Sequence, residues 1–481
     1  MLNEIQQEAQ QLRAELKSNQ QKMLDKLLTI LAECIDEQTI EQAYKKRDFK
    51  QLNKYKNLIN GIYQVLNHKA KDPVDIRELL DPNDFWEMYE GENLLFDLAN
   101  EKIDVHTIQF SDDFVHYMYL SNHHDLYIDG QKQEINGHVM DVEFFPNSNK
   151  YATTYKRYGQ DSWGIMVDGH DLEVEFSHIS KLTLNPNGQD VMYVGSQDLR
   201  GDSKVYLNKD PYTKKYQFFD EIKISENGQS NLIKASNQDG KLILINGKEW
   251  SNEIKIENRV GEISPNGAKV VVDGRIKSNS VKSIPYVNQK PWDYPLDGQC
   301  LSAAFSPDSQ KLAASFRVRS GKHTIVIDKE VIYGNYKLIY GNYKKEVFGL
   351  RFTPDSKHIV GTTLEGHTLI YDDNEIECIL PSVERDSIYN ISPDSNFVIK
   401  PSKNKYDEKK QTLILFDFNQ DKVCVQYSML ESYDDIKLPV FSPDSKKIIF
   451  IARKGSQYFR VVKNVEDFIA QSLDSEEQEI K

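Results

Sequence analysis

Residues 304–315 read AFSPDSQKLAAS, and residues 441–451 read FSPDSKKIIFI. In both stretches an apolar run leads into a Pro-Asp-Ser turn, and a second apolar run follows. Proline sets the backbone for the first central position of a type I turn, and the following Asp and Ser complete it. The flanking runs are rich in residues that favour strands. Each stretch therefore predicts a β-hairpin.

The same phrase recurs along the chain, with Pro-Asn-Gly or Pro-Asn-Ser in some copies and without the proline in the two weakest. The residue before the proline position in each copy serves as an anchor, and the anchors are residues 111, 145, 185, 225, 264, 306, 353, 392 and 442. Their spacings are 34, 40, 40, 39, 42, 47, 39 and 50 residues. A second hairpin follows in several copies, where Asp129-Gly130, Asp168-Gly169 and Asn246-Gly247 favour tight type I′ turns. Each unit is predicted to be a four-stranded antiparallel meander.

Four-stranded meanders repeated at about forty residues are typical of the blades of a β-propeller. A sandwich would need no such regular unit, and the strand pattern excludes a helical solenoid. The last repeat lacks a fourth strand, so we expect ring closure to borrow one from 93–97 or 101–107. Nine anchors favour nine blades, or eight if the degenerate first unit is not a blade. Two tandem propellers would need a linker, which the sequence does not show.

The repeated phrase resembles the WD40-like family, in particular the bacterial Phe-Ser-Pro-Asp-Gly variant of TolB-type and prolyl-oligopeptidase-type propellers. The resemblance covers about residues 103–464. It implies the fold strongly and the function weakly, because one fold hosts many functions. The Trp-Asp dipeptide of the eukaryotic repeat is missing, and only Gly137-His138 matches its Gly-His.

The sequence before the ring predicts an α-helical hairpin. Apolar residues at helical spacing indicate one amphipathic helix over 2–35 and a second over about 38–70. The end of the chain is acidic and predicts a short helix. We therefore expect a helical arm over 1–92, a propeller over 93–464 and an acidic helix or tail over 465–481.

The charges of the arm are segregated. Residues 41–71 hold eight basic and two acidic residues, whereas 74–104 hold ten acidic and two basic ones. The favoured interpretation is structural: a solvent-exposed helix whose positive charge is compensated by the acidic segment beside it. The functional interpretation is a face for RNA or an acidic protein, and its candidate residues are Lys45, Lys46, Arg47 and Lys50.

A tandem heptad, IYGNYKL at 332–338 and IYGNYKK at 339–345, accounts for the 47-residue spacing. A duplication survives most easily on an outer strand or its loop, where the chain tolerates insertion. A neutral duplication is the favoured interpretation. The alternative is a peripheral patch that grips a partner, because tyrosine is favoured at interfaces. Its candidate residues are Tyr333, Tyr336, Tyr340 and Tyr343.

Composition narrows the class of protein further. The 481 residues carry 60 Lys and Arg against 74 Asp and Glu, a formal charge of −14, which argues against a dedicated nucleic-acid binder. No apolar run is long enough for a membrane span, and the first residues show no secretory signal, so we expect a cytoplasmic protein. The four cysteines are far apart and form no metal-binding, haem-binding or disulfide pattern.

Motifs that would indicate catalysis are missing from the sequence. We find no Gly-x-Ser-x-Gly motif and no glycine-rich phosphate loop. His123-His124-Asp125 is the one local metal-like cluster, but adjacent histidines in a loop diverge and rarely bind one ion. Trp163, Trp250 and Trp292 are expected to pack within blades. We therefore expect no catalytic residue, no cofactor and no metal.

A ring without catalytic residues, attached to a helical arm, is most simply an interaction scaffold. The first hypothesis is a non-enzymatic subunit of a larger intracellular complex whose partners are other protein subunits. Similar propellers also occur as accessory subunits of bacterial electron-transfer complexes. Two further alternatives are a small-ligand or peptide binder using the central channel, and an RNA- or translation-associated propeller using the basic helix. The channel hypothesis predicts polar and aromatic residues at the starts of the inner strands.

Overall fold

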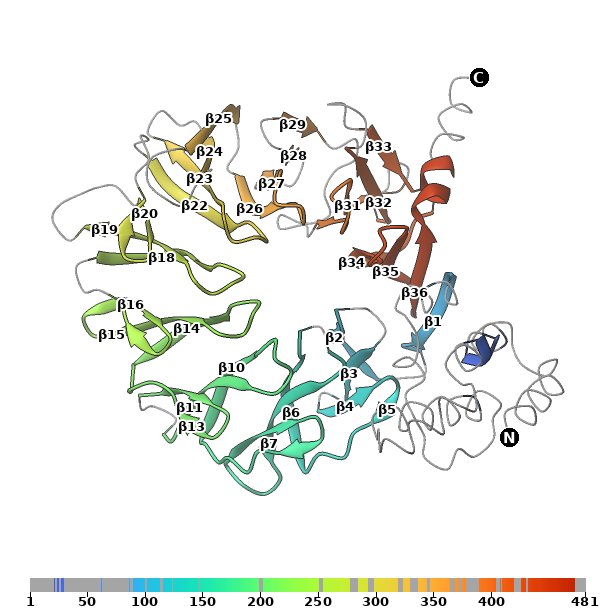
Figure 1. Cartoon of the computed structure of the whole chain (residues 1–481). Helices are drawn as coiled ribbons and strands as arrows, with labels where there is room; N and C mark the ends of the chain where they lie inside the picture. Colours follow the sequence, from blue (N-terminus) through green and yellow to red (C-terminus); the bar gives the residue numbers. More distant parts are fainter. Residues whose placement is uncertain are drawn as a thin grey trace, which may run out of the picture.

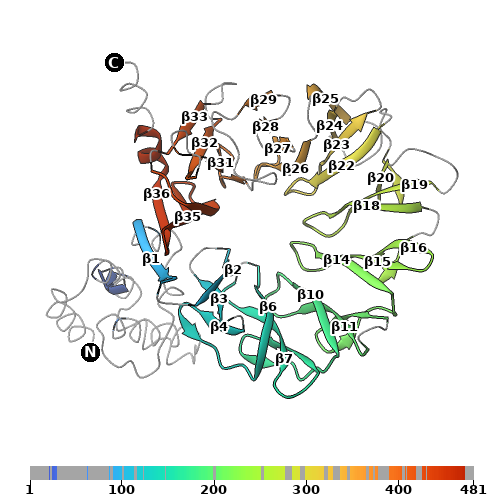
Figure 2. The ribbon, with the colours of Figure 1, turned by 180° about the vertical axis from the view of Figure 1, so that it is seen from behind.

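The computed structural model shows a ring of β-sheets around a central opening (Figure 1 and Figure 2). Besides Gln21, Leu24, Asp25, Leu27–Thr29, Ile62 and Trp86, the structure describes residues 90–471 apart from 100–101, 113–115, 123, 147, 199–201, 251–253, 277–283, 293–297, 319–322, 329–335, 344–346, 364–367, 372–373, 378–388, 404–406, 408, 419–424 and 430. The predicted helical hairpin lies outside these residues, except for single positions. Among the described residues, no helix has the length and apolar character needed to span a membrane.

The described residues form nine antiparallel sheets of four strands each. The strands of blades 1–4 are, in order, β2 Ile103–Phe110, β3 Tyr117–Ser121, β4 Asp125–Ile128, β5 Gln131–Lys132; β6 Gly137–Phe144, β7 Tyr151–Arg157, β8 Trp163–Val167, β9 His170–Asp171; β10 His178–Leu184, β11 Val191–Ser196, β12 Lys204–Leu207, β13 Asp210–Pro211; β14 Phe218–Ile224, β15 Asn231–Asn237, β16 Gly240–Ile245 and β17 Lys248–Glu249.

The remaining blades repeat the same order. The strands of blades 5–8 are β18 Ile254–Ile263, β19 Val270–Ile276, β20 Ile284–Val287, β21 Lys290–Pro291; β22 Gly298–Phe305, β23 Leu312–Val318, β24 His323–Asp328, β25 Tyr336–Tyr343; β26 Val347–Phe352, β27 Ile359–Thr363, β28 Thr368–Tyr371, β29 Asn374–Glu377; β30 Asn390–Ile391, β31 Phe397–Lys403, β32 Gln411–Asp417 and β33 Val425–Ser428. Blade 9 contains β34 Asp435–Phe441, β35 Lys447–Lys454, β36 Gln457–Asn464 and β1 Gly91–Asp97. Residues 465–471 are helical.

The predicted anchors mark the blades without exception. Each anchor is the residue that directly follows the first strand of a blade, from Ser111 after β2 to Ser442 after β34. The degenerate first unit is therefore a true blade, and the favoured count of nine is confirmed. The Asp-Gly and Asn-Gly turns have positive φ at both residues, as at Asp168 (48°) and Gly169 (78°), which confirms the predicted type I′ geometry.

The first strand of each blade lies nearest the axis, and the first strands of neighbouring blades contact one another around much of the ring (Figure 1). Apolar side chains fill the space between blades. One such cluster joins Ala313 and Ile325 of blade 6 to Val347 and Leu350 of blade 7. Trp250 and Trp292 are buried in clusters of this kind, as expected. The core is thus divided among blade interfaces rather than gathered in one centre.

The ring is closed by a strand from the start of the chain. β1 pairs antiparallel with β36, from Gly91 opposite Val462 to Asp97 opposite Gln457. The first of the two predicted closing segments is therefore the correct one, and most of the second belongs to β2. Trp86, which is 1% exposed, packs in the same apolar cluster as Phe96. The chain just before β1 is thereby attached to the closing blade.

The Pro-Asp-Ser turns bind each other from blade to blade. The carboxylate of Asp308 accepts a hydrogen bond from the N–H of Gln310 at 2.9 Å, as predicted for a turn cap. The N–H of Asp308 in turn donates to Oγ of Ser356, in the turn of the next blade, at 3.1 Å. The same inter-blade bond joins Asn266 to Ser309, Asp355 to Ser395 and Asp394 to Ser445, at 3.0–3.1 Å. We call these four bonds the turn latches.

The serines of the turn latches adopt φ values of 61–67°, a region that favours glycine. In blades 3, 4 and 5 glycine stands at this position, and a Cβ on Gly228 would lie 2.3 Å from Oδ1 of Asn185. There the bridging side chain is Asn185 of the preceding blade, whose Nδ2 donates a hydrogen bond to the carbonyl of Gly228 at 3.0 Å. Between blades 3 and 4 the side chain that bridges the two turns thus comes from the preceding blade, whereas in the turn latches it comes from the following blade.

Candidate functional site

A register shift between the first and second strands recurs in eight of the nine described blades, and the candidate site lies beside three of these shifts. In blades 2, 3 and 4 the pairing between the first and second strands shifts register, between Val139 and Asp141, between Ser180 and Thr183, and between Phe219 and Glu221. Such bulges bend a strand and re-aim its side chains. Lys181 lies within one of them at a φ of 53°. The bulges turn polar residues toward the space beside the channel.

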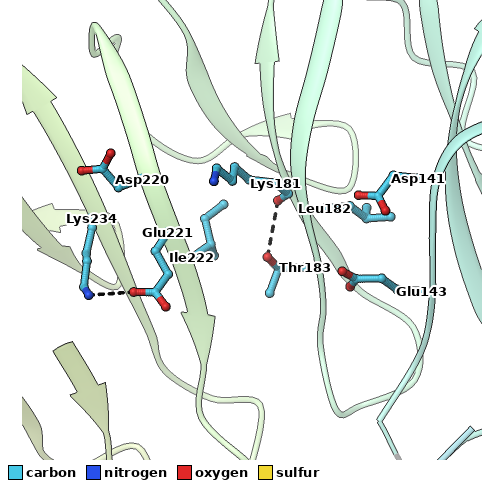
Figure 3. A pocket seen from close by; sticks show the side chains of 9 residues that line it. All are labelled: Asp141, Glu143, Lys181, Leu182, Thr183, Asp220, Glu221, Ile222 and Lys234. Carbon is cyan, nitrogen blue, oxygen red and sulfur yellow. Dashed lines mark hydrogen bonds and ion pairs between the residues drawn. The ribbon is translucent and has the colours of Figure 1, made fainter. Parts of the chain in front are cut away.

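A pocket of about 540 Å³ lies between the three inner strands β6, β10 and β14. Figure 3 shows side chains from all three strands converging on it, together with Lys234 from β15. Seven of its nine described lining residues are polar. The nine residues are Asp141, Glu143, Lys181, Leu182, Thr183, Asp220, Glu221, Ile222 and Lys234. We call it the channel pocket.

The blade 4 side of the channel pocket is an ion-pair network. Nζ of Lys234, a largely buried side chain, lies 2.7 Å from Oε2 of Glu221. Lys223 lies beside Glu221 and also binds Oε1 of Glu262 in blade 5 at 2.8 Å. Burial alone would raise the pKa of Glu221, but the hydrogen bond from Lys234 and the charge of Lys223 lower it below its ordinary value. Glu221 on this side of the pocket is therefore ionised and paired with two lysines.

A glycine makes that network sterically possible. A Cβ on Gly261 would lie 2.4 Å from Cε of Lys234, because the lysine stem crosses the inner strand of the next blade. A side chain at 261 would therefore oblige the end of Lys234 to shift from its place beside Glu221.

The blade 2 side carries carboxylates instead. Asp141 and Glu143 stand two residues apart on β6, and both face the channel pocket (Figure 3). Burial, together with the charge of Asp141, raises the pKa of Glu143 to about 7. Glu143 is therefore partly protonated near neutral pH, and a cation placed in the pocket would stabilise its ionised form.

The middle wall comes from blade 3 and supplies a basic and a hydroxyl group. Lys181 reaches toward the pocket, and Oγ1 of Thr183 donates to the carbonyl of Lys181 at 3.4 Å across the bulge (Figure 3). None of the nine described lining residues is a serine, cysteine or histidine. Their polar groups are four carboxylates, two ammonium groups and the hydroxyl of Thr183, which can bind a ligand of complementary charge.

The partner-binding residues predicted from the sequence lie elsewhere. Lys45, Lys46, Arg47, Lys50 and Tyr333 lie outside the described residues. Tyr336, Tyr340 and Tyr343 belong to β25, and only the backbone of these three is described. β25 is the outermost strand of blade 6, as expected for a tolerated duplication. Whether these tyrosines bind a partner stays a prediction.

Sequence reasoning did not identify the residues of the channel pocket. A signal was present, because Glu143 and Thr183 each stand two residues before an anchor. Aligning the repeats on their anchors would have placed both on inner strands. The channel hypothesis expected polar and aromatic residues there, and the pocket lining is polar without aromatic residues.

The histidine cluster also looks different in three dimensions. His123 lies outside the described residues, while the ring of His124 meets that of His138 in the next blade at a tilt of 55°, with centroids 4.3 Å apart. Among the described residues, no group of three His, Cys, Asp or Glu side chains is placed to hold a metal ion. Cys300 is buried, and burial raises its pKa above the ordinary value of a thiol.

Comparison with known proteins gives distant structural likeness. Neither a family model nor a curated protein matches the chain. Among solved structures, the chain is similar to a eukaryotic initiation factor (11% identity, 75% of this chain and 91% of that one, TM-score 0.45) and to the Dos1 propeller (11% identity, 68% and 92%, TM-score 0.39). It is also similar to TolB from Acinetobacter baumannii (13% identity, 56% and 60%, TM-score 0.28). The chain is a β-propeller by its own strand pairing, and membership of the WD40-like family stays a prediction.

Proposed function

We propose that this protein is a non-enzymatic interaction scaffold that serves as a subunit of a larger protein assembly. The observation that carries the proposal is the channel pocket, to which three different blades bring polar side chains. Pockets for small organic ligands are lined mainly by apolar and aromatic groups. The channel pocket has only Leu182 and Ile222 of that kind, which favours a polar protein segment as its occupant.

The construction of the ring supports the same role. A strand from the start of the chain closes it, and turn latches join its later blades. The blades of the pocket are joined by the apolar cluster between blades 2 and 3 and by the hydrogen bond from Asn185 to Gly228, so their inner strands form a fixed platform. A preorganised surface loses little conformational entropy when a partner binds. We further propose that residues 1–92 act as a second contact element, because Trp86 fixes the chain before β1 to the closing blade. The first residues of the acidic segment, 465–471, are helical, and Val465 and Phe468 pack in the apolar cluster of blades 8 and 9.

Affinity purification of the full chain from a lysate of its native host, at moderate salt and followed by cross-linking, tests the proposal. We expect one or more proteins in stoichiometric amount. We also expect a double variant, Asp141→Ala with Lys181→Ala, to lose at least one of them, because both side chains line the channel pocket. A full chain that purifies alone under these conditions would show that the scaffold role is wrong. A truncation at residue 100 is unsuitable, because it would remove β1 and open the ring.

A further inference from the structure

Three successive blades carry an exposed ring side chain at the same place. His138 pairs with Lys156, His178 with Ser196, and Phe218 with Ser236 across the first two strands of their blades. The partner is 18 residues further on in each case, so the three positions are structurally equivalent. All three are exposed, and Phe218 reaches 62%. We call this row the aromatic rim.

Neighbouring rings contact two of the three rim residues, His138 and His178. The ring of Tyr158 meets His138 edge-on at 4.8 Å, and Trp163 lies against His178 at 4.9 Å. Trp163 also packs on the apolar cluster between blades 2 and 3, so its own position is fixed. Tyr158 is 50% exposed and widens the rim. Exposed aromatic side chains on a rigid support are characteristic of protein-binding surfaces, because they lose little entropy on binding.

The aromatic rim and the channel pocket belong to the same three strands. Asp141, Lys181 and Asp220 follow the rim residues within three positions along β6, β10 and β14. The anchors of these blades, residues 145, 185 and 225, lie beyond the other end of the three strands. A partner resting on the rim would therefore reach the pocket before it reaches the anchor turns.

The charges of the pocket indicate which partner fits. Its described lining holds four carboxylates and two ammonium groups, and one of each is already paired as Glu221 with Lys234. Asp141 and Glu143 face the pocket from blade 2 without an ammonium partner in any described ion pair. A cationic side chain entering beside them gains charge complementarity, and aromatic faces at the rim attract cations as well.

We propose that the aromatic rim and channel pocket together dock an extended protein segment that presents a lysine or arginine beside apolar residues. The basic side chain enters between Asp141 and Glu143, and its apolar neighbours cover Phe218 and the rings beside His178. This inference rests on the proposed scaffold function and names the partner chemistry of its site.

Selection of random twelve-residue peptides displayed on phage, with the full-length protein as bait, tests the inference. A labelled peptide made from the selected sequences is then titrated by fluorescence polarisation against four proteins: the wild type, a rim variant (His178→Ala with Phe218→Ala), a charge variant (Asp141→Asn with Glu143→Gln) and a control. The control is Leu94→Ala, which removes an equally exposed apolar side chain on β1, at 54% exposure. Circular dichroism checks that all four are folded.

We expect the selected peptides to share a basic residue next to apolar ones. The affinity of the labelled peptide should fall at least about tenfold in the rim and charge variants, should stay unchanged in Leu94→Ala, and should weaken with added salt. Acidic selected sequences, undiminished binding to the rim variant, or no selected sequence at all would overturn the inference. If affinity purification still yields a stoichiometric partner in that case, the scaffold function stands and only the docking face is wrong.

Discussion

The backbone N–H of Asp308 donates a hydrogen bond to the hydroxyl of Ser356 at 3.1 Å, although the two residues belong to different blades. In addition, Nζ of Lys311 donates to the carbonyl of Ser356 at 2.5 Å. Both bonds connect turns that the sequence shows as separate copies of one phrase. The repeated Ser therefore has a role between blades as well as within its own turn.

Two substitutions of Ser356 distinguish the stability that the inter-blade hydrogen bond contributes from the cost of the strained backbone at this position. Ser356 is 5% exposed and has a φ of 61°. Ser356→Ala removes the acceptor of the Asp308 N–H and keeps a side chain at positive φ, so we expect a loss of about 1–2 kcal/mol in the free energy of unfolding. Ser356→Gly relieves the strain and should cost less, by about 1 kcal/mol. Urea unfolding measures both, and equal losses would contradict the strain argument.

Glu92 holds the closing strand to the ring. Its carboxylate accepts a hydrogen bond from the buried hydroxyl of Tyr433 at 2.8 Å and lies 2.7 Å from Nζ of Lys454. Glu92→Ala leaves the Tyr433 hydroxyl buried without this acceptor, and we expect a loss of about 1–3 kcal/mol in unfolding free energy. Faster limited proteolysis near β1 should accompany it. Leu94→Ala, on the same strand but exposed, is the control and should change neither measurement.

The same carboxylate makes closure sensitive to acid. Burial would raise the pKa of Glu92, but the hydrogen bonds from Lys454 and Tyr433 outweigh it and lower the pKa below the ordinary 4.5. A lowered folded-state pKa stabilises the protein above the unfolded-state pKa and loses that effect as the pH falls through the folded value. The wild type should therefore lose stability below about pH 4.5 more steeply than Glu92→Gln. Parallel acid titrations of the two proteins would contradict this.

Glu143 titrates in the opposite sense. Its folded-state pKa is raised to about 7 from an ordinary 4.5, so ionisation is less favourable in the folded chain than in the unfolded one. The protein should lose stability as the pH rises from about 4.5 through 7, and Glu143→Gln should remove that loss. We expect the variant to be more stable than the wild type at pH 8 and similar to it at pH 4. Thermal unfolding across this range, with Asp239→Asn as an exposed control, measures the difference.

Deletion of one copy of the tandem heptad tests whether the duplication is neutral for the stability of the protein. β25 is an outermost strand that pairs only with β24 in its sheet, and the two copies carry nearly the same sequence. Removing residues 332–338 should let the second copy take the place of the first, with a change in unfolding free energy of less than about 1 kcal/mol. A larger loss in urea unfolding would show that the duplicated length is needed in blade 6.

The repeating turn made the fold predictable. Proline and the residues after it determine a turn through local backbone preferences, so the nine copies could be counted and spaced before any contact was known. The type I′ turns at Asp129, Asp168 and Asn246 were predictable for the same reason, because positive φ is a local property. The closing strand could only be narrowed to two segments, since β1 and β36 are neighbours in blade 9 but lie more than 350 residues apart in the sequence, as Asp97 and Gln457 do.

The sequence by itself thus determined the nine turns, the four-stranded blades and their order, because each depends on interactions between residues close in the chain. Only the tertiary structure decided which side chains meet. Glu143, Lys181 and Glu221 stand about forty residues apart, on equivalent strands of three blades, and their convergence depends on strand bulges and on the packing of neighbouring blades. No local preference encodes that packing, so the candidate site appears only once the ring is formed.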